Sequence, residues 1–207
     1  MNEVVLEIGV VIILIAINGA FSLSELAIVS ARKIRLKKLA DDGRRGAAAA
    51  LALADDPGRF LSTVQIGITL VGILAGAFSG ATLGERLKDI LLTRGFSLAV
   101  ADSVGYGVVI GLITYFSVVV GELLPKNLAL RNAEAIACRV APTMSVISRI
   151  AAPLVWLLDA STRLIFWIFG QSTEPENAVT DEEIKTLVAE AQTAGVIEAH
   201  EQQMISA

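Results

Sequence analysis

Residues 4–29 read VVLEIGVVIILIAINGAFSLSELAIV, an apolar run interrupted around Asn18-Gly19 and over 22–25. A helix needs about 20 apolar residues to cross about 30 Å of hydrocarbon, so this run is long enough to span a membrane. The chain begins with acidic residues and shows no small-residue cleavage pattern, whereas a secretory signal peptide begins with positive charge. We therefore expect a retained transmembrane helix.

The composition of the 207 residues supports a membrane location. Apolar residues make up 54% of the chain and charged residues 18%, against about 45–50% and about 25% in a soluble domain. The net charge of −4 argues against a nucleic-acid partner, and the sequence has no phosphate loop, catalytic triad or metal-hydrolase motif. With one cysteine and one histidine, any bound cation must be held by oxygen atoms. We expect an integral membrane protein that is not an enzyme.

Two further apolar runs, at 60–83 and 104–124, bring the number of expected spans to three. The segment between the first two spans is strongly basic, with Arg32, Lys33, Arg35, Lys37, Lys38, Arg44, Arg45 and Arg59. Because positively charged loops stay in the cytoplasm, we expect a multi-pass protein of the inner cell membrane. Its N-terminus lies outside and its C-terminus in the cytoplasm.

Residues 134–169 are apolar on average but contain arginines, Asp159 and two prolines. A charge facing lipid near the bilayer centre costs about 2.5–3.5 kcal/mol. We therefore favour two short helices, broken near Pro153, lying at the interface or dipping into the inner leaflet. A fourth span over 154–169 is the alternative.

Outside the spans, residues 30–54 predict a basic amphipathic helix lying on anionic lipid. After Gly170 the chain becomes polar and acidic, and Thr180 with Glu183 forms a capping box that starts a helix. We expect a transmembrane domain over 1–170 and acidic cytoplasmic linker helices over 171–207. The fold class is all-α: three transmembrane helices, a short interfacial helix pair and a cytoplasmic juxtamembrane helix.

Each expected span carries one stripe of polar and small residues. Asn18, Ser22 and Glu25 fall at i, i+4 and i+7, which is one helical face. Similar stripes on the other spans comprise Ser62, Gln65, Thr69, Gly72 and Gly76, and Gly107, Gly111, Thr114, Ser117 and Gly121. Helix packing explains the glycines, because small residues let backbones approach. The polar oxygens also suit a cation site.

The sharpest local feature is Gly121-Glu122-Leu123-Leu124-Pro125-Lys126. Pro125 has no N–H, so the carbonyl of Gly121 loses its helical partner. A bare carbonyl, the Glu122 carboxylate and a helix C-terminus together attract a cation. Oxygen atoms of Asn18, Ser22 and Thr69 could complete the shell that Mg²⁺ prefers.

An alternative explanation for this motif is purely structural. Pro125 simply ends the helix, and Glu122 pairs with Lys126 one turn later. Glu25, close to Arg32 and Lys33, is similarly ambiguous between an ion pair and cation contact.

Several segments resemble the cyclin-M/CorC family of magnesium transporters. They are NGAFSLSELA at 18–27, FLSTVQIG at 60–67, GELLPK at 121–126, TDEE at 180–183 and GVIE at 195–198. The resemblance implies a homodimeric transmembrane domain that transports Mg²⁺, with efflux coupled to Na⁺ entry. In that family nucleotide-binding CBS modules follow the acidic helices. We expect ATP to act only through such modules, which are absent from this chain.

The resemblance places the cation ligands on Asn18, Ser22, Thr69, Gly121 and Glu122. We expect the third span to shift about the helix break at Pro125. Many relatives carry an asparagine where Ile68 or Gly72 stands here. The expected function is Mg²⁺ transport by alternating access, with Mg²⁺ held between the three spans. The alternative is a membrane-anchored Mg²⁺ sensor that regulates another channel and moves no ions itself.

Overall fold

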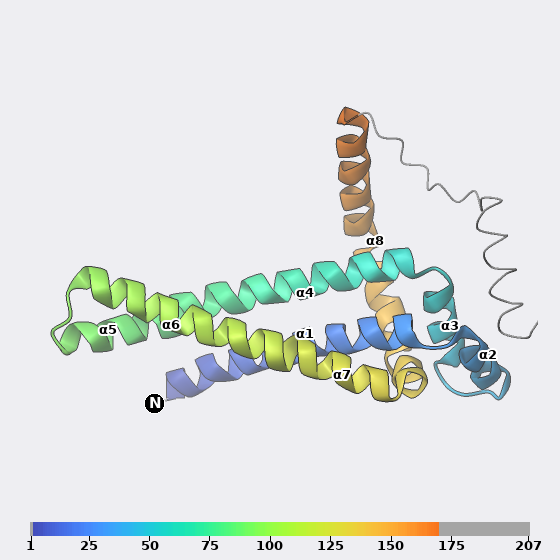
Figure 1. Ribbon diagram of the computed structural model, residues 1–207, viewed down its shortest axis with the longest axis horizontal. Coiled ribbons are helices and arrows are strands. Elements are labelled where there is room, and N and C mark those ends of the chain that lie inside the picture. The colour runs from blue at the N-terminus through green and yellow to red at the C-terminus, as the bar shows by residue number, and fades with distance from the viewer. Residues whose placement is uncertain (1, 170–207) are drawn as a thin grey trace, which may run out of the picture. The chain divides into compact units, whose positions relative to one another are not determined.

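The computed structural model describes residues 2–169, and every regular element in this range is helical (Figure 1). The expected all-α membrane class is confirmed. The elements are α1 (Asn2–Ser30), α2 (Lys33–Asp41), α3 (Ala47–Asp55), α4 (Pro57–Ser79), the π-helical η1 (Gly80–Gly84), α5 (Glu85–Thr93), α6 (Leu98–Val118), the π-helical η2 (Val119–Leu123), α7 (Leu124–Arg131) and α8 (Ala133–Ile168).

The helices α1, α4 and α6 lie side by side, with α4 running opposite to the other two (Figure 1). Four segments are long and apolar enough to cross a membrane: Glu3–Ser30, Pro57–Thr93, Leu98–Arg131 and Ala133–Ile168. The second and third are longer than the sequence predicted, because the helices continue through η1 and η2 into charged residues. Large apolar side chains such as Leu70, Ile73 and Tyr115 are exposed, as expected of helices that face lipid.

The juxtamembrane segment forms two helices where one was expected. Gly43 and Gly46 both have positive φ angles, +74° and +80°, which end α2 and start α3. A Cβ at Gly46 would collide with the carbonyl oxygen of Cys138 in α8, so glycine is required there. Pro142 removes the helical donor of that same carbonyl, which leaves room for the loop to pack directly on α8.

The buried core of this region joins the end of α1, both juxtamembrane helices and the starts of α4 and α8. Its fully buried large side chains are Ile28, Leu36, Phe60 and Val64. A hydrogen bond of 3.3 Å between the hydroxyls of Thr63 and Ser148 also links α4 to α8. This packing fixes the ends of the candidate spans relative to one another.

The structure corrects the expected helix pair over 134–169. α8 is a single helix, Ala133–Ile168, with both Pro142 and Pro153 inside it. Each proline removes only one N–H from the ladder, and the hydrogen bonds on either side keep the helix continuous. The first of two compact units in the chain ends at Asp159. The expected capping box at Thr180 and the acidic helices lie outside the described residues.

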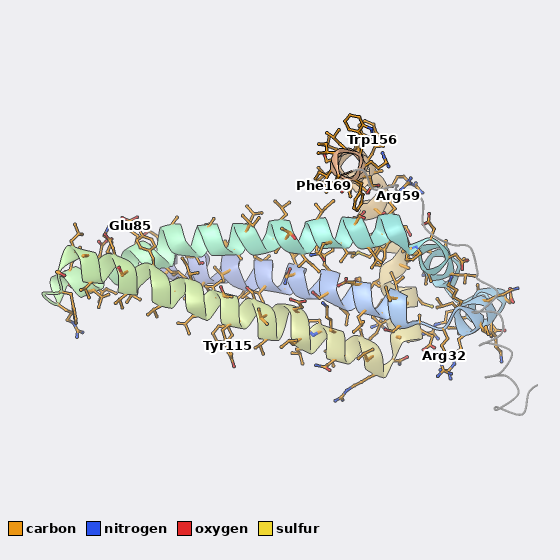
Figure 2. The ribbon with its side chains drawn as sticks, turned by 45° about the horizontal axis from the view of Figure 1, so that its top comes forward. Arg32, Arg59, Glu85, Tyr115, Trp156 and Phe169 are labelled. Carbon is orange, nitrogen blue, oxygen red and sulfur yellow. The ribbon has the colours of Figure 1, made fainter. Side chains whose placement is uncertain are left out.

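Ion pairs join the helices at the end opposite α2 and α3. Arg86 of α5 donates to Glu3 at 3.1 Å and to Glu7 at 2.9 Å, both on α1. Lys88 and Asp102 link α5 to α6 at 2.9 Å. Arg32 and Glu85 mark the two ends in Figure 2. The charged residues are therefore gathered at the ends of the bundle.

Candidate cation site

The candidate site lies where α1 crosses η2, and two glycines make the crossing close. A Cβ at Gly19 would lie 3.8 Å from the Cα of Gly121 and 3.2 Å from Cγ of Pro125. A Cβ at Gly121 would lie 3.3 Å from the carbonyl oxygen of Ile15. Small residues thus bring the two backbones together, as in other membrane helix pairs.

The carbonyl of Gly121, which we expected from the sequence to be bare and available to a cation, accepts a hydrogen bond from another helix. Its oxygen accepts a hydrogen bond of 3.2 Å from Nδ2 of Asn18. The local backbone is π-helical from Val119 to Leu123, a geometry that often marks functional sites in long helices. The missing N–H of Pro125 and the π-helical turn together turn this carbonyl toward α1.

Two side-chain oxygens on this face of α1 are buried and have no hydrogen-bond partner. They are Oδ1 of Asn18 and Oγ of Ser22, and Ser22 is completely buried. The two residues are one helical turn apart on the same face of α1. Ser24, two residues further on, is equally buried, but its hydroxyl donates to the carbonyl of Ala20 at 2.6 Å. Unpartnered buried oxygens are costly, so Asn18 and Ser22 are candidates for binding a ligand.

A group of three charges lies next to these oxygens. Lys126 contacts the Glu122 carboxylate at 2.7 Å and the Glu25 carboxylate at 3.6 Å. The ion pair between Glu122 and Lys126 is therefore formed. From the sequence, this pair was the alternative to cation binding at the motif. Glu25 forms the ion pair that the sequence left open, but with Lys126 instead of Arg32 or Lys33. One ammonium group compensates two carboxylates, so the group carries a net negative charge.

Thr69 is not brought to this group. Gly67 is the residue of α4 that faces α1, because a Cβ there would lie 2.9 Å from the ring of Phe21. Two residues further on, Thr69 is rotated by about 200° around the helix, and its side chain is exposed. Of the five predicted ligand positions, the structure joins Asn18 to Gly121 by a hydrogen bond. Ser22 lies one turn from Asn18 on α1, and Glu122 follows Gly121 within η2.

Residues 9–201 match the cyclin M transmembrane N-terminal domain. The chain belongs to this family. It is 46% identical over 204 residues to the UPF0053 protein sll0260 of Synechocystis, covering 99% of this chain and 46% of that protein. The UPF0053 protein YhdT of Bacillus subtilis is 32% identical over 94% of this chain and 42% of its own length.

A further cyclin M relative is the polyamine export protein of Escherichia coli K12. It is 31% identical over 199 residues, which are 96% of this chain and 44% of that protein. The chain thus spans less than half the length of the curated relatives that it matches. The comparisons establish a multi-pass membrane domain of the cyclin M family.

Two residues near the candidate site were not predicted as site residues from the sequence. Gly19 allows the close crossing, and Lys126 bridges two carboxylates. Both occur inside the quoted motifs, and the spacing of Glu122 and Lys126 predicted their pairing. No three histidine, cysteine, aspartate or glutamate side chains of residues 2–169 gather as a metal cluster. The candidate site is instead built mainly from neutral oxygens.

Proposed function

We propose that this domain transports Mg²⁺ and binds it between α1 and η2. The observation that carries the proposal is the pair of buried, unpartnered oxygens of Asn18 and Ser22 beside the Gly121 carbonyl. A carboxylate oxygen of Glu122 is the fourth candidate ligand. Mg²⁺ prefers six oxygen ligands in an octahedron and usually retains some of its water, so four protein oxygens form a suitable shell.

The amide of Asn18 suggests how binding and release alternate. In the structure its nitrogen donates to the Gly121 carbonyl. A half-turn of the amide would place Oδ1 there instead, and two facing oxygens repel unless a cation lies between them. The hydrogen bond and the bound cation therefore exclude each other. We propose that Asn18 closes the site in the cation-free state and opens it when Mg²⁺ binds.

The Glu122 carboxylate must also change partner during transport. Lys126 holds it at 2.7 Å, which keeps its charge compensated when no cation is bound. When Mg²⁺ arrives, Lys126 can remain with Glu25 at the same interface. At the other end, Arg86 joins α1 to α5 about 16 Å along α1 from Asn18. Alternating access would require this ion pair to open.

We further propose that the domain works as a homodimer in the inner membrane, with an outer N-terminus and Na⁺ as the coupling ion. The basic segment after α1 supports this orientation. Flux of Mg²⁺ into liposomes, with and without a Na⁺ gradient, tests transport and coupling together. A protein that binds Mg²⁺ but gives no flux would be the sensor that the sequence left open.

The decisive variants are Ser22→Ala and its matched control Ser24→Ala. Both remove a buried hydroxyl from α1, but only that of Ser22 has no partner. Ser22→Ala should weaken Mg²⁺ affinity about fivefold and leave cation-free stability equal or higher. Ser24→Ala should leave the affinity unchanged. Calorimetric Mg²⁺ titration and thermal unfolding measure both effects, and equal affinities in the two variants would contradict the site.

A second candidate cargo is a polyamine, because relatives of this domain are named polyamine export proteins. The supporting observation is that an ammonium group, that of Lys126, already lies between Glu25 and Glu122. A polyamine would present ammonium groups to the same carboxylates. Spermidine flux that survives Ser22→Ala but is lost in Glu25→Gln would favour this cargo. Mg²⁺ flux that is lost in Ser22→Ala but survives Glu25→Gln would favour Mg²⁺.

A further inference from the structure

A polar cavity lies at the end of the bundle that holds α2 and α3. Its volume is about 750 Å³. The loop between α2 and α3 and the first turns of α8 form its walls, with Arg44, Arg45, Gly46, Asn132, Ala135, Ile136, Cys138, Arg139 and Pro142. We call it the arginine cleft. None of its lining residues is acidic.

The charges of the arginine cleft are not compensated by a neighbouring side chain. Arg44, Arg45 and Arg139 are exposed, and none of the salt bridges found within residues 2–169 involves them. Glu134, in the first turn of α8, pairs with Arg35. Three arginines without a salt-bridge partner therefore line one concave surface. Guanidinium groups bind phosphate oxygens in a two-pronged geometry.

Two helices also direct their positive ends to the arginine cleft. α3 begins directly after Gly46, and its first turn has no side-chain cap. α8 begins directly after Asn132, whose amide can donate as well. The N-terminus of a helix has free N–H groups and a partial positive charge, which favour an anion. The arginine side chains and the helix N-termini therefore both favour an anion in the arginine cleft.

The cleft is held in shape by the packing of its floor. The loop at Gly46 lies directly against the Cys138 carbonyl, where even a methyl group has no space. Ala47 and Ala137, which flank the cleft, are completely buried. Such a floor keeps the guanidinium-bearing loop next to α8 without any ligand. An anion would thus enter a site that is already formed.

We propose that the arginine cleft binds the phosphate group of an anionic phospholipid. Its position supports a lipid source, because two candidate spans end beside it, at Ser30 and at Arg131. The ends of membrane spans lie at the level of the lipid headgroups. The volume accommodates a phosphate with its glycerol substituent. This binding would anchor α3 against α8 at the membrane surface.

The test measures phosphatidylglycerol binding to the purified chain in neutral detergent by native mass spectrometry. The triple variant Arg44→Gln/Arg45→Gln/Arg139→Gln should bind this lipid about a hundredfold more weakly. The control Arg32→Gln/Lys37→Gln/Lys38→Gln removes three charges from the same basic segment, and these residues lie outside the cleft. It should bind as the unaltered chain does.

Phosphatidylcholine and sn-glycerol 3-phosphate serve as comparison ligands. Phosphatidylcholine should bind more weakly than phosphatidylglycerol, and glycerol phosphate should not displace the lipid at equal concentration. Equal weakening in the two triple variants, or no preference over phosphatidylcholine, would overturn the proposal. Displacement by glycerol phosphate would overturn the lipid source and assign the cleft to a soluble phosphate ester. If the triple variant is thermally destabilised, the single variant Arg139→Gln should still weaken phosphatidylglycerol binding about fivefold.

Discussion

The two π-helical segments, η1 and η2, have similar backbones but different surroundings. In η1 and just before it, the hydroxyls of Ser79 and Thr82 donate to carbonyls of their own helix, at 3.1 Å and 2.8 Å. Gly84, the last residue of η1, is covered by the ring of Tyr106. In η2 the Gly121 carbonyl instead accepts a hydrogen bond from α1. The first segment is closed by packing and the second faces polar groups.

This difference shows that a π-helical turn does not by itself make a site. A π-helical turn interrupts the regular hydrogen bonds of an α-helix. The neighbouring side chains determine whether its carbonyls are covered by packing or available to a ligand. Around η1 hydroxyls and an aromatic ring satisfy and cover the turn. Around η2 the partner is Asn18, whose second polar atom stays unpartnered, next to the unpartnered hydroxyl of Ser22. The cation site is therefore assigned to η2.

The largest difference between η1 and η2 is expected when one methyl group is added to each. Gly121→Ala places a Cβ 3.1 Å from Nδ2 of Asn18 and 3.3 Å from the Ile15 carbonyl oxygen, whereas Gly80 has nothing within 4 Å. Because the helices must separate slightly, Gly121→Ala should weaken Mg²⁺ affinity about thirtyfold, or about 2 kcal/mol. Gly80→Ala should leave it unchanged.

Calorimetric titration of Mg²⁺ measures both glycine variants. Thermal unfolding without Mg²⁺ serves as the control for folding. If Gly80→Ala weakened Mg²⁺ binding as much as Gly121→Ala, the two π segments would be equivalent and the assignment to η2 would fail.

The next prediction compares the acidic residues of the two segments. Glu122 lies within η2, and Glu85 directly follows η1 with an exposed side chain. Glu122→Gln should weaken Mg²⁺ affinity about tenfold, because it replaces a charged ligand with a neutral one. Glu85→Gln changes the net charge equally and should have no effect. Similar losses in both variants would indicate general electrostatic attraction of Mg²⁺ instead of direct coordination.

Much of this organisation could be predicted from the sequence. Apolar runs predict the first three candidate spans, because length and hydropathy suffice to cross a bilayer. The position of Pro125 predicts that the carbonyl of Gly121 lacks its partner within the helix, since proline has no N–H. Helical spacing predicts that Asn18 and Ser22 share a face, and that Glu122 reaches Lys126. Each of these inferences depends on residues close together in the chain.

The features that the sequence missed depend on tertiary contacts. α8 stays continuous through Pro153, because its remaining hydrogen bonds and its packing on α4 outweigh one lost bond. Thr69 shares a polar stripe with Ser62, yet the face of α4 toward α1 is set by Gly67 and the Phe21 ring. Helical periodicity defines the faces of one helix but does not say which face meets a neighbour. The contact between Lys126 and Glu25 likewise depends on how α1 and α7 cross.

The smallest effect is expected for Pro125→Ala. The new N–H can donate to the Gly121 carbonyl and so compete with both Asn18 and the cation for that oxygen. Mg²⁺ affinity should fall about threefold, while the thermal stability of the cation-free protein should rise, because alanine restores a helical hydrogen bond. Pro57→Ala is the matched control: Pro57 begins α4, where an N–H has no helical partner in any case. Calorimetric titration and thermal unfolding distinguish the two prolines. An affinity that stays constant in Pro125→Ala would mean that η2 turns its carbonyl toward α1 without the proline, so that the π-helical turn is sufficient.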